Sequence, residues 1–311
     1  MVTKISVVMP VYNGEKFLDE VIGAVLNQTF KDFELIIIND KSTDNSLNII
    51  NKHAKRDKRI VVLSNKRNMG AQYTRNRGLK IAKGEYIANL DADDVCLSDR
   101  FEFQTNYLDN HPDIFMVGGS AIVIDENGNR IGVFLKYESS EELRKKLPKT
   151  NCMIFPSLMY RNTKQFFMRE KFPISEDYDI ILNMLSAGKN IINFPKFLIK
   201  YRVNKSSNTF TKKNPEYFFG KAREFYQQRV DTGKDDYENL KIPDIVIQVD
   251  PDKSDLAIHI IAEFQDNQRR KVRENIIKYI KRYGFNLTFV SYYVLSFLPT
   301  KVYTHLRKRL F

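Results

Sequence analysis

Three carboxylates stand within four positions, at Asp91, Asp93 and Asp94, directly after an apolar segment that ends at Leu90. Like charges at this spacing disfavour one another's ionisation unless a cation lies among them. Carboxylates that follow a buried segment are also costly to desolvate without a partner. Oxygen ligands without histidine suit Mg²⁺ or Mn²⁺, which keep waters and take further oxygens from phosphates. The cluster therefore predicts a metal-bound diphosphate, and the alternative is a solvated strand end.

The segments around these acids alternate between two hydrophobic periods. Apolar, β-branched runs predict four strands, at 5–12, 33–40, 59–65 and 86–94. Helical spacing of apolar residues predicts three helices between them, at 15–28, 42–57 and 70–84. This order is typical of an α/β fold with a mainly parallel sheet covered by helices on both faces. Because ligands bind such sheets at the carboxyl ends of strands, we expect Pro10–Gly14, Asn39–Ser42 and Asp91–Asp94 to form one rim.

The remainder of the chain is predicted to hold a hairpin, further helices and a boundary. An Asn-Gly turn between two apolar runs after residue 114 indicates a hairpin. A loop that leads into a helix is expected at 172–190, a strand and a polar loop within 194–209, and a further helix at about 215–230. The polar, turn-rich stretch at 231–255 predicts a first domain at 1–231 and a helical, basic C-terminal region at 232–311.

Several common sites are absent from the sequence. No G-x-G-x-x-G follows the first strand, and no G-x-x-x-x-G-K-[ST] occurs anywhere. This disfavours a dinucleotide fold and a P-loop ATPase, in which a helix N-terminus holds the phosphates. The four histidines are widely spaced and there are only two cysteines, which disfavours a zinc site. A metal is therefore expected to take the phosphate-binding role.

Three segments resemble the inverting family-2 nucleotide-sugar glycosyltransferases with the GT-A fold. They read "ISVVMPVYNGEKFLDEVIGAVLNQTFKDFELIIINDKSTDNS", "NMGAQYTRNRGLKIAKGEYIANLDADD" and "SEDYDI". The resemblance covers roughly residues 3–230, and the motifs occur in the order of the family. It implies a nucleotide-binding, mainly parallel sheet flanked by helices, here followed by a helical, basic extension.

The resemblance implies roles for the positions that match the family's motifs. The nucleotide-sugar-binding positions would be Pro10, Val11, Tyr12, Asn13, Asp40, Asp91, Asp93 and Arg202. Within this set the first three would line the base pocket, Asp40 would bond the base, and Arg202 would lie near the diphosphate. Asp93 and Asp94 would be the ligands of Mg²⁺ or Mn²⁺, and Asp177 would be the catalytic base. For Asp40, a turn or capping role is the alternative.

The chemistry expected from this set is a single displacement. A metal neutralises the charge of the departing diphosphate as a Lewis acid. The acceptor hydroxyl attacks the opposite face of the sugar, and Asp177 takes its proton, which inverts the anomeric centre. A retaining double displacement would need a second nucleophile, and none is identified. Arg75 is expected to pair locally, and Asp179 could equally be an ordinary acid at a helix start.

The chain also departs from the family's pattern. Phe155 and Asn204 stand where the family often has histidines, and Ser98 stands where a proline is common. The loss of two donors predicts an activity that is weaker, altered in acceptor or absent. The alternatives are therefore a membrane-attached sugar-nucleotide-binding protein without turnover, or a nucleotidyltransferase. A nucleotidyltransferase would need a Gly-rich loop with basic residues near the first strand, and the chain offers little of that there.

Most of the net charge of +12 comes from the end of the chain. Residues 269–311 contain eleven Lys and Arg and one acid, Glu274. The apolar stretch 285–298 would span about 21 Å as a helix, against about 30 Å of bilayer hydrocarbon. Such a basic, aromatic-rich end is typical of a segment that lies on an anionic membrane surface. The alternative is a core-packing or dimerising helix pair. Nucleic acid is not expected as a partner, because no recognised binding module is present.

These expectations combine into a hexosyltransferase that takes its sugar from a nucleotide-diphosphate donor. The acceptor would be a glycan or lipid-linked hydroxyl in cell-surface polysaccharide or glycolipid synthesis. No secretory signal is visible, so we expect a cytoplasmic enzyme, peripheral on the inner face of the cell membrane. The chain has no tryptophan and hence no Q-x-x-R-W motif, so it is expected to add one sugar or a few rather than a long polymer.

Overall fold

The computed structural model describes residues 3–204, 214–243, 250–299, 302–303 and 306. Nine strands form one sheet: β1 Ile5–Val11, β2 Phe33–Asn39, β3 Ile60–Ser64, β4 Tyr86–Asn89, β5 Val95–Cys96, β6 Ile114–Ile124, β7 Arg130–Phe134, β8 Met159–Arg161 and β9 Asn190–Arg202. The helices are α1 Leu18–Leu26, α2 Ser46–Ala54, α3 Ala71–Ile81, α4 Arg100–Asn110, α5 Ser140–Lys146, α6 Glu176–Ser186, α8 Pro215–Thr232, α9 Pro251–Gln265, α10 Arg269–Tyr283 and α11 Leu287–Leu295.

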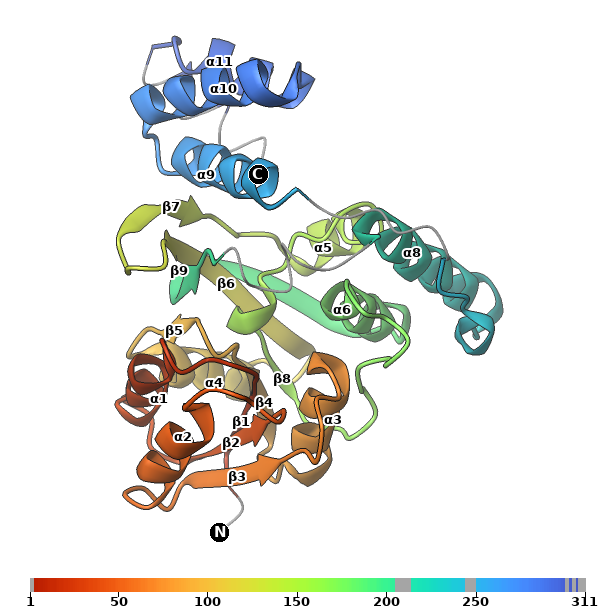
Figure 1. Cartoon of the computed structure of the whole chain (residues 1–311). Coiled ribbons are helices and arrows are strands. Elements are labelled where there is room, and N and C mark those ends of the chain that lie inside the picture. Colours follow the sequence, from red (N-terminus) through yellow and green to blue (C-terminus); the bar gives the residue numbers. More distant parts are fainter. Residues whose placement is uncertain (1–2, 205–213, 244–249, 300–301, 304–305, 307–311) are drawn as a thin grey trace.

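The sheet has a parallel half and a mixed half. Its order is β3-β2-β1-β4-β8-β6-β9-β5, with β7 paired to β6. Strands β3, β2, β1 and β4 are parallel, whereas β8 runs antiparallel to both β4 and β6. The α/β fold class predicted from the sequence is confirmed, and the helices cover the sheet on both faces (Figure 1).

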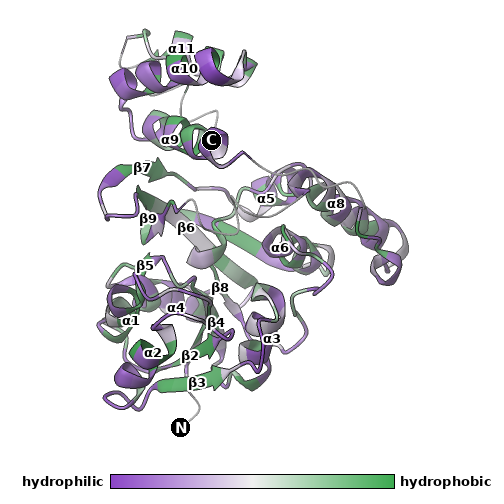
Figure 2. Ribbon diagram, in the orientation of Figure 1, coloured by the Kyte–Doolittle hydropathy of each residue, from purple (hydrophilic) through white to green (hydrophobic). Residues whose placement is uncertain are grey.

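Two apolar cores lie on the two faces of the parallel half. Because side chains alternate along a strand, Val7 and Met9 face α1 and α4, whereas Val8 faces α3 and α6. Strand β1 is buried along almost its whole length and β2 along all of it, and the stretch of β2 that is visible in Figure 2 has the colour of hydrophobic residues. Gly78 lets α3 approach closely, since a Cβ there would lie 2.7 Å from the side chains of Val8 and Ile38. Continuous burial explains why these strands read as uninterrupted apolar runs.

The C-terminal helices α9, α10 and α11 have a small core of their own. Its buried members are Ile260, Phe264, Val272, Ile276, Tyr279, Phe289, Tyr292 and Tyr303. Helix α9 lies directly on β7, and α10 and α11 stack beyond it (Figure 1). None of the helices in the described ranges is long and apolar enough to cross a membrane.

The predicted boundary at 231/232 coincides with the end of α8 at Thr232. The segment that follows still packs against the first domain, because Asp235 pairs with Arg169 and the Tyr237 hydroxyl accepts from Lys171 N at 2.9 Å. The division into domains at 1–231 and 232–311 stays a prediction. The predicted strand within 194–209 ends at Arg202 as β9, and positions 205–209 lie outside the described residues.

Candidate active site

The carboxyl ends of β1, β2 and β4 meet at one rim of the sheet. In register, Val11 faces Asn39 across β1 and β2, and Val8 faces Asn89 across β1 and β4. The contact between β1 and β2 continues one residue beyond the end of β2, because Asp40 N donates to Val11 O at 2.7 Å. The rim therefore brings together the loops that the sequence analysis singled out.

The loops after β1 and β2 are bonded to each other. Asn13 N donates to Ser42 Oγ at 3.1 Å, and Thr43 N donates to Asn13 Oδ1 at 2.8 Å. Asn13 adopts φ of +50°, a left-handed conformation that asparagine tolerates. Beside this junction the Tyr12 side chain is 51% exposed and free to meet a ligand, whereas the Val11 side chain is buried in the core. Val11 can therefore present only its backbone to a nucleotide.

Asp40 organises the loop between β3 and α3. Its buried carboxylate accepts from Asn65 Nδ2 at 2.6 Å, from Met69 N at 2.8 Å and from Gly70 N at 2.9 Å. Gly70 has φ of +86°, which a side chain at that position would disfavour. These bonds hold the start of α3 against the rim, and a bond from Asp40 to a base stays a prediction.

Asp91 is paired with Arg75 of α3. Arg75 Nη2 donates to Asp91 Oδ1 at 2.5 Å, while Nη1 donates to the carbonyls of Val8 and Leu90. The guanidinium lies 5.1 Å from the ring centroid of Phe155. The local pairing expected for Arg75 is thus what the structure has. Phe155 is buried beneath it and has no polar atom to offer a diphosphate.

Asp93 and Asp94 are acids in an unfavourable environment. Burial and the charge of Asp91 raise the pKa of Asp93 to about 7. Burial, with the charges of Asp93 and Asp91, raises the pKa of Asp94 well above its usual value. Asp94 Oδ1 accepts from Arg202 N at 2.8 Å, but Oδ2 is buried and has no hydrogen-bond partner in the described part of the chain.

The donor set at this point is compatible with a Mg²⁺-type ion. Among the described residues, no three His, Cys, Asp or Glu side chains are arranged to hold a metal. Mg²⁺ commonly takes only one or two carboxylates and completes its shell with waters and substrate phosphates. The unpartnered Oδ2 of Asp94 and the raised pKa of Asp93 are what a nearby cation would correct.

Asp177 lies in the first turn of α6 and faces the same acids. Its carboxylate accepts from Tyr178 N at 2.7 Å and from Asn151 Nδ2 at 3.3 Å. Burial raises the pKa of Asp177, the Tyr178 N–H opposes this, and the charge of Asp91 raises the pKa further. Asp91 and Asp177 are 86 positions apart in sequence, yet they are close enough to affect each other's ionisation.

Arg202, at the end of β9, fastens the loop that carries Asp93. Its Nε donates to Asp93 O at 2.8 Å, and Nη1 donates to the carbonyls of Asp125 and Glu126. Nη2 pairs with Glu20 Oε2 of α1 at 2.6 Å. The guanidinium is therefore committed to the protein, and contact with a diphosphate stays a prediction. Asn204 ends the described segment.

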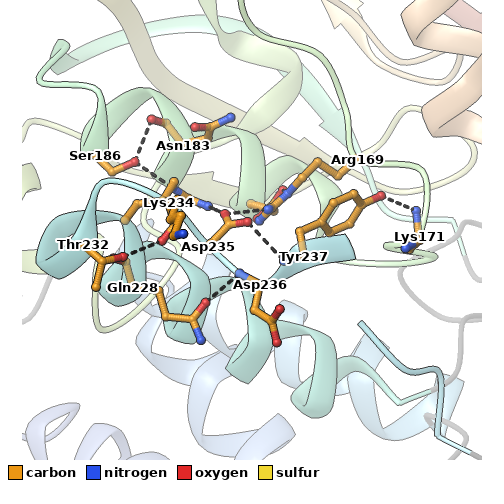
Figure 3. Close-up of polar contacts among 12 residues, drawn as sticks. Arg169, Lys171, Asn183, Ser186, Gln228, Thr232, Lys234, Asp235, Asp236 and Tyr237 are labelled. Atoms are coloured by element: carbon orange, nitrogen blue, oxygen red, sulfur yellow. Dashed lines mark hydrogen bonds and ion pairs between the residues drawn. The ribbon is translucent and has the colours of Figure 1, made fainter. Parts of the chain in front are cut away.

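Asp179 belongs to a different cluster, which is built around Arg169 and Asp235; these two residues are labelled in Figure 3. Arg169 contacts both carboxylate oxygens of Asp179 and donates to Asp235 Oδ2 at 2.7 Å, and Arg229 contacts the same Asp235 oxygen. The Arg169 guanidinium also lies 4.5 Å from the ring centroid of Tyr237. This cluster anchors the first turn of α6 to the end of α8. Asp179 is thus the structural acid at a helix start that the sequence allowed.

Two contacts of the site were not expected from the sequence. Asn151 reaches Asp177 across 26 positions, and Glu20 reaches Arg202 across 182 positions. Asparagine and glutamate are common surface residues, so neither position carries a local signal. The positions of the acids after predicted strands were enough to predict the rim, but they did not reveal the groups that orient these acids.

Comparisons with known proteins agree with this geometry. The sequence model of Glycosyl transferase family 2 matches residues 6–168. An uncharacterized glycosyltransferase of Methanocaldococcus jannaschii is 38% identical over 210 residues, which cover 66% of this chain and 72% of that protein. The O-antigen biosynthesis glycosyltransferase WbnJ of Escherichia coli is 33% identical over 236 residues, covering 73% and 91%.

Solved structures of S. aureus TarS share the fold. TarS 1–349 in complex with UDP has a TM-score of 0.55 at 18% identity, covering 98% of this chain and 91% of that one. TarS 1–349 in complex with UDP-GlcNAc has a TM-score of 0.57 at 17% identity, covering 96% and 82%. At this level of identity the likeness concerns the arrangement of the elements.

Proposed function

Because this chain belongs to glycosyl transferase family 2, we propose that it moves a hexosyl group from a nucleotide-diphosphate donor to an acceptor hydroxyl with inversion. The observation that carries the proposal is the convergence of Asp91, Asp93, Asp94 and Asp177 on one rim of the sheet. Burial raises the pKa of Asp93, Asp94 and Asp177, and acids of this kind are typical of sites that bind cations or move protons.

The diphosphate end of the donor would lie over Asp93 and Asp94. The unpartnered Oδ2 of Asp94 supports these two carboxylates as the protein ligands of Mg²⁺ or Mn²⁺. A bound ion of this kind supplies Lewis-acid neutralisation of the charge that develops on the departing diphosphate. Arg202 holds both residues in place, because its Nε donates to the Asp93 carbonyl and its backbone N–H donates to the Asp94 carboxylate.

Asp177 would act as the general base. Its raised pKa suits a group that must hold a proton after taking it from a hydroxyl near neutral pH. Asn151 and the Tyr178 N–H each donate to one of its oxygens and so fix the orientation of the carboxylate. With one base and no covalent intermediate, attack from the face opposite the diphosphate inverts the anomeric centre.

The nucleoside would lie across the ends of β1 and β2. The exposed ring of Tyr12 offers a stacking surface, and Pro10, Asn13 and Asp40 belong to the same two strand ends. Structures of S. aureus TarS, which shares the fold, contain UDP or UDP-GlcNAc, and this supports a sugar nucleotide as the class of donor. The fold alone does not distinguish one base from another, so the donor is best identified by experiment.

The acceptor would be a glycan or lipid-linked hydroxyl in the synthesis of a cell-surface polysaccharide or glycolipid. The similarity to WbnJ, an O-antigen biosynthesis glycosyltransferase, supports this setting. The concentration of Lys and Arg at 269–311 supports a peripheral position on the inner face of the cell membrane. These two features together favour an acceptor that is presented at a membrane surface.

A second candidate function is a sugar-nucleotide-binding protein without turnover. Phe155 favours it, because this buried ring stands where the family often has a histidine and cannot donate a hydrogen bond. The rim would then bind a donor but stabilise its departing diphosphate poorly. The two candidates differ in a single measurable property, which is release of the nucleoside diphosphate.

The test is nucleoside-diphosphate release from a panel of sugar nucleotides, with Mn²⁺ and with a chelator. The wild type is expected to release product from one donor with metal, and Asp93→Ala is expected to lose that release. Donor binding without release, even with membrane extract as a source of acceptor, would favour the second candidate. Release that persists at full rate in the chelator would contradict the metal assignment.

A further inference from the structure

The exposed apolar side chains of this protein gather at one end. Eleven large apolar side chains are exposed in the described residues, and six of them lie in the C-terminal part of the chain, between positions 277 and 302: Ile277, Phe285, Leu287, Val294, Phe297 and Val302. Phe285 is 72% exposed and Leu287 is 78% exposed, which are the highest values of the set. So many exposed apolar groups in one short segment are unusual for a part of a protein that meets only water.

Helix α11 is apolar on two opposite sides. Phe289 and Tyr292 are buried against α10 and α9. Leu287 and Val294 are seven positions apart and therefore share the opposite side, which faces outward. Phe285 adds to this side from the turn that joins α10 to α11. The inner side explains how α11 packs, and the outer side has no such explanation within the described part of the chain.

Exposed cations lie on α10, the helix that packs against α11. Residues 269–311 contain eleven Lys and Arg and one acid, and seven of the cations belong to α10. Lys278 and Lys281 are exposed on α10. In contrast, Arg282 pairs with Asp252 and Arg270 pairs with Glu274, so these two contribute less. The four remaining cations of the sequence lie outside the described residues.

We propose that α10 and α11 dock on an anionic lipid surface, with Phe285, Leu287 and Val294 in the interfacial layer and the α10 lysines among the headgroups. Apolar burial and attraction to anionic lipid act together in this geometry. A second copy of the chain is a poorer occupant, because it would bring the same positive charge to the contact. With nine residues, α11 spans about 14 Å, so it lies in the interface and does not cross it.

The docking helices are fixed to the domain that carries the rim. Gly132 of β7 permits this, since a Cβ there would lie 2.4 Å from the backbone of Ala262 in α9. Arg130 of β7 pairs at 2.6 Å with Asp266, the residue that follows α9. Docking would therefore hold the catalytic domain at one orientation to the membrane. The inference deepens the proposed function, because it names the surface on which a lipid-linked acceptor would be met.

The test is sedimentation of the full chain with vesicles of phosphatidylcholine, alone or with about 30% phosphatidylglycerol. The wild type is expected to bind the anionic vesicles, and to bind them less as salt is raised. The triple variant Phe285→Ser, Leu287→Ser, Val294→Ser is expected to bind at least about tenfold more weakly. Lys278→Glu with Lys281→Glu is expected to weaken binding and to reduce its dependence on salt.

A matched control uses exposed apolar side chains outside the C-terminal helices. Val230 is 52% exposed and Ile242 is 61% exposed, so Val230→Ser with Ile242→Ser removes exposed apolar groups of the same kind from another part of the chain. This control is expected to bind vesicles as the wild type does. Circular dichroism checks that the triple variant keeps its helices. We expect it to do so because the three substituted side chains lie on the surface.

Three results would overturn the docking proposal. They are equal binding to neutral and anionic vesicles, unchanged binding of the triple variant, and a wild-type dimer in light scattering that the triple variant converts to monomer. Donor hydrolysis by water, measured without vesicles, separates this proposal from the proposed function. Hydrolysis without vesicle binding would contradict the docking proposal and leave the proposed function standing. Vesicle binding without hydrolysis would contradict the proposed function and leave the docking proposal standing.

Discussion

Helix α6 carries two aspartates, two positions apart, in opposite electrostatic surroundings. Asp179 contacts Arg169, which also binds Asp235 and so joins α6 to the end of α8 (Figure 3). Asp177 instead receives the neutral donors Asn151 and the Tyr178 N–H, and the charge of Asp91 raises its pKa. The first acid is matched by cations, whereas the second has no ion pair among the described residues.

The difference shows where this fold uses charge for packing and where it uses charge for chemistry. In the Arg169 cluster, burial raises the pKa of Asp179 against the opposing charge of Arg169, while Arg169 and Arg229 outweigh burial at Asp235 and lower its pKa. At the rim, burial and like charges raise the pKa of Asp93 to about 7. Acids that the protein leaves uncompensated are available to a cation, a substrate or a proton. Residue type alone does not separate the two groups, but their partners do.

The largest expected effect comes from changing the two aspartates of α6 separately. Asp177→Asn is expected to lower turnover by about 10²–10⁴ while the protein keeps its stability and donor affinity, because only the base is lost. Asp179→Asn is the matched variant, and it is expected to lower the free energy of unfolding while each folded molecule keeps its turnover. Steady-state kinetics and urea unfolding measure both. Equal loss of turnover in the two variants would remove the distinction between them.

Removing a cation from the paired cluster is expected to cost stability. Arg169→Met leaves Asp179 and Asp235 with fewer cationic partners, which should lower the free energy of unfolding by about 3–5 kcal/mol. Arg270→Met is the control, since its pair with Glu274 is exposed and should be worth less than about 1 kcal/mol. Urea denaturation compares them. A loss of similar size in both variants would show that burial of the Arg169 cluster does not matter.

Removing an acid from the rim is expected to act on the ligand instead. Asp93→Ala should weaken donor binding in Mn²⁺ by at least about tenfold, because a metal ligand is lost. Asp99→Ala is the control, because the Asp99 carboxylate pairs with Lys196 at 2.6 Å. Calorimetric titration with donor and Mn²⁺ measures the affinities. Unchanged affinity in Asp93→Ala would place the diphosphate elsewhere.

The smallest expected effect is a shift to higher pH of the acid side of the profile of kcat/KM against pH. The pKa of Asp177 is raised above its usual 3.8, and a base works only when deprotonated. The value of kcat/KM should therefore fall as pH is lowered through a midpoint above 3.8. The same shift favours the protonated form in the folded state, so its contribution to stability decreases as pH rises from 3.8 through the folded pKa. A limb centred at or below 3.8 would contradict the account.

The parallel half of the sheet and its rim could be predicted from the sequence, because local signals determine them. Strands β1 and β2 are buried on both faces and therefore read as continuous apolar runs. The mixed half could not be predicted in the same way. Strand β8 has only three residues, Met159–Arg161, and its pairing with β4 and β6 depends on contacts far apart in the chain.

The groups that orient the site illustrate the same limit. Asp91, Asp93 and Asp94 stand together in the sequence, so their common chemistry was visible there. The contacts from Asn151 to Asp177 and from Glu20 to Arg202 have no such signal, because each joins residues brought together only by the sheet.

The C-terminal region was predicted in part. The basic, apolar character of 269–311 indicated a surface-active end, but the turn that places Phe285 and Leu287 side by side was not evident. The attachment to β7 was not evident either, since Gly132 looks like any glycine of a hairpin until α9 is seen against it. The membrane assignment itself stays a prediction.

The most direct test of the central claim is the anomeric configuration of the sugar released from the donor. Water can serve as the acceptor, and NMR can record the free sugar before it mutarotates. If Asp177 removes the proton in a single displacement at the rim, the sugar appears with the configuration opposite to that of the donor. A sugar of the same configuration would require a second nucleophile and would contradict the mechanism.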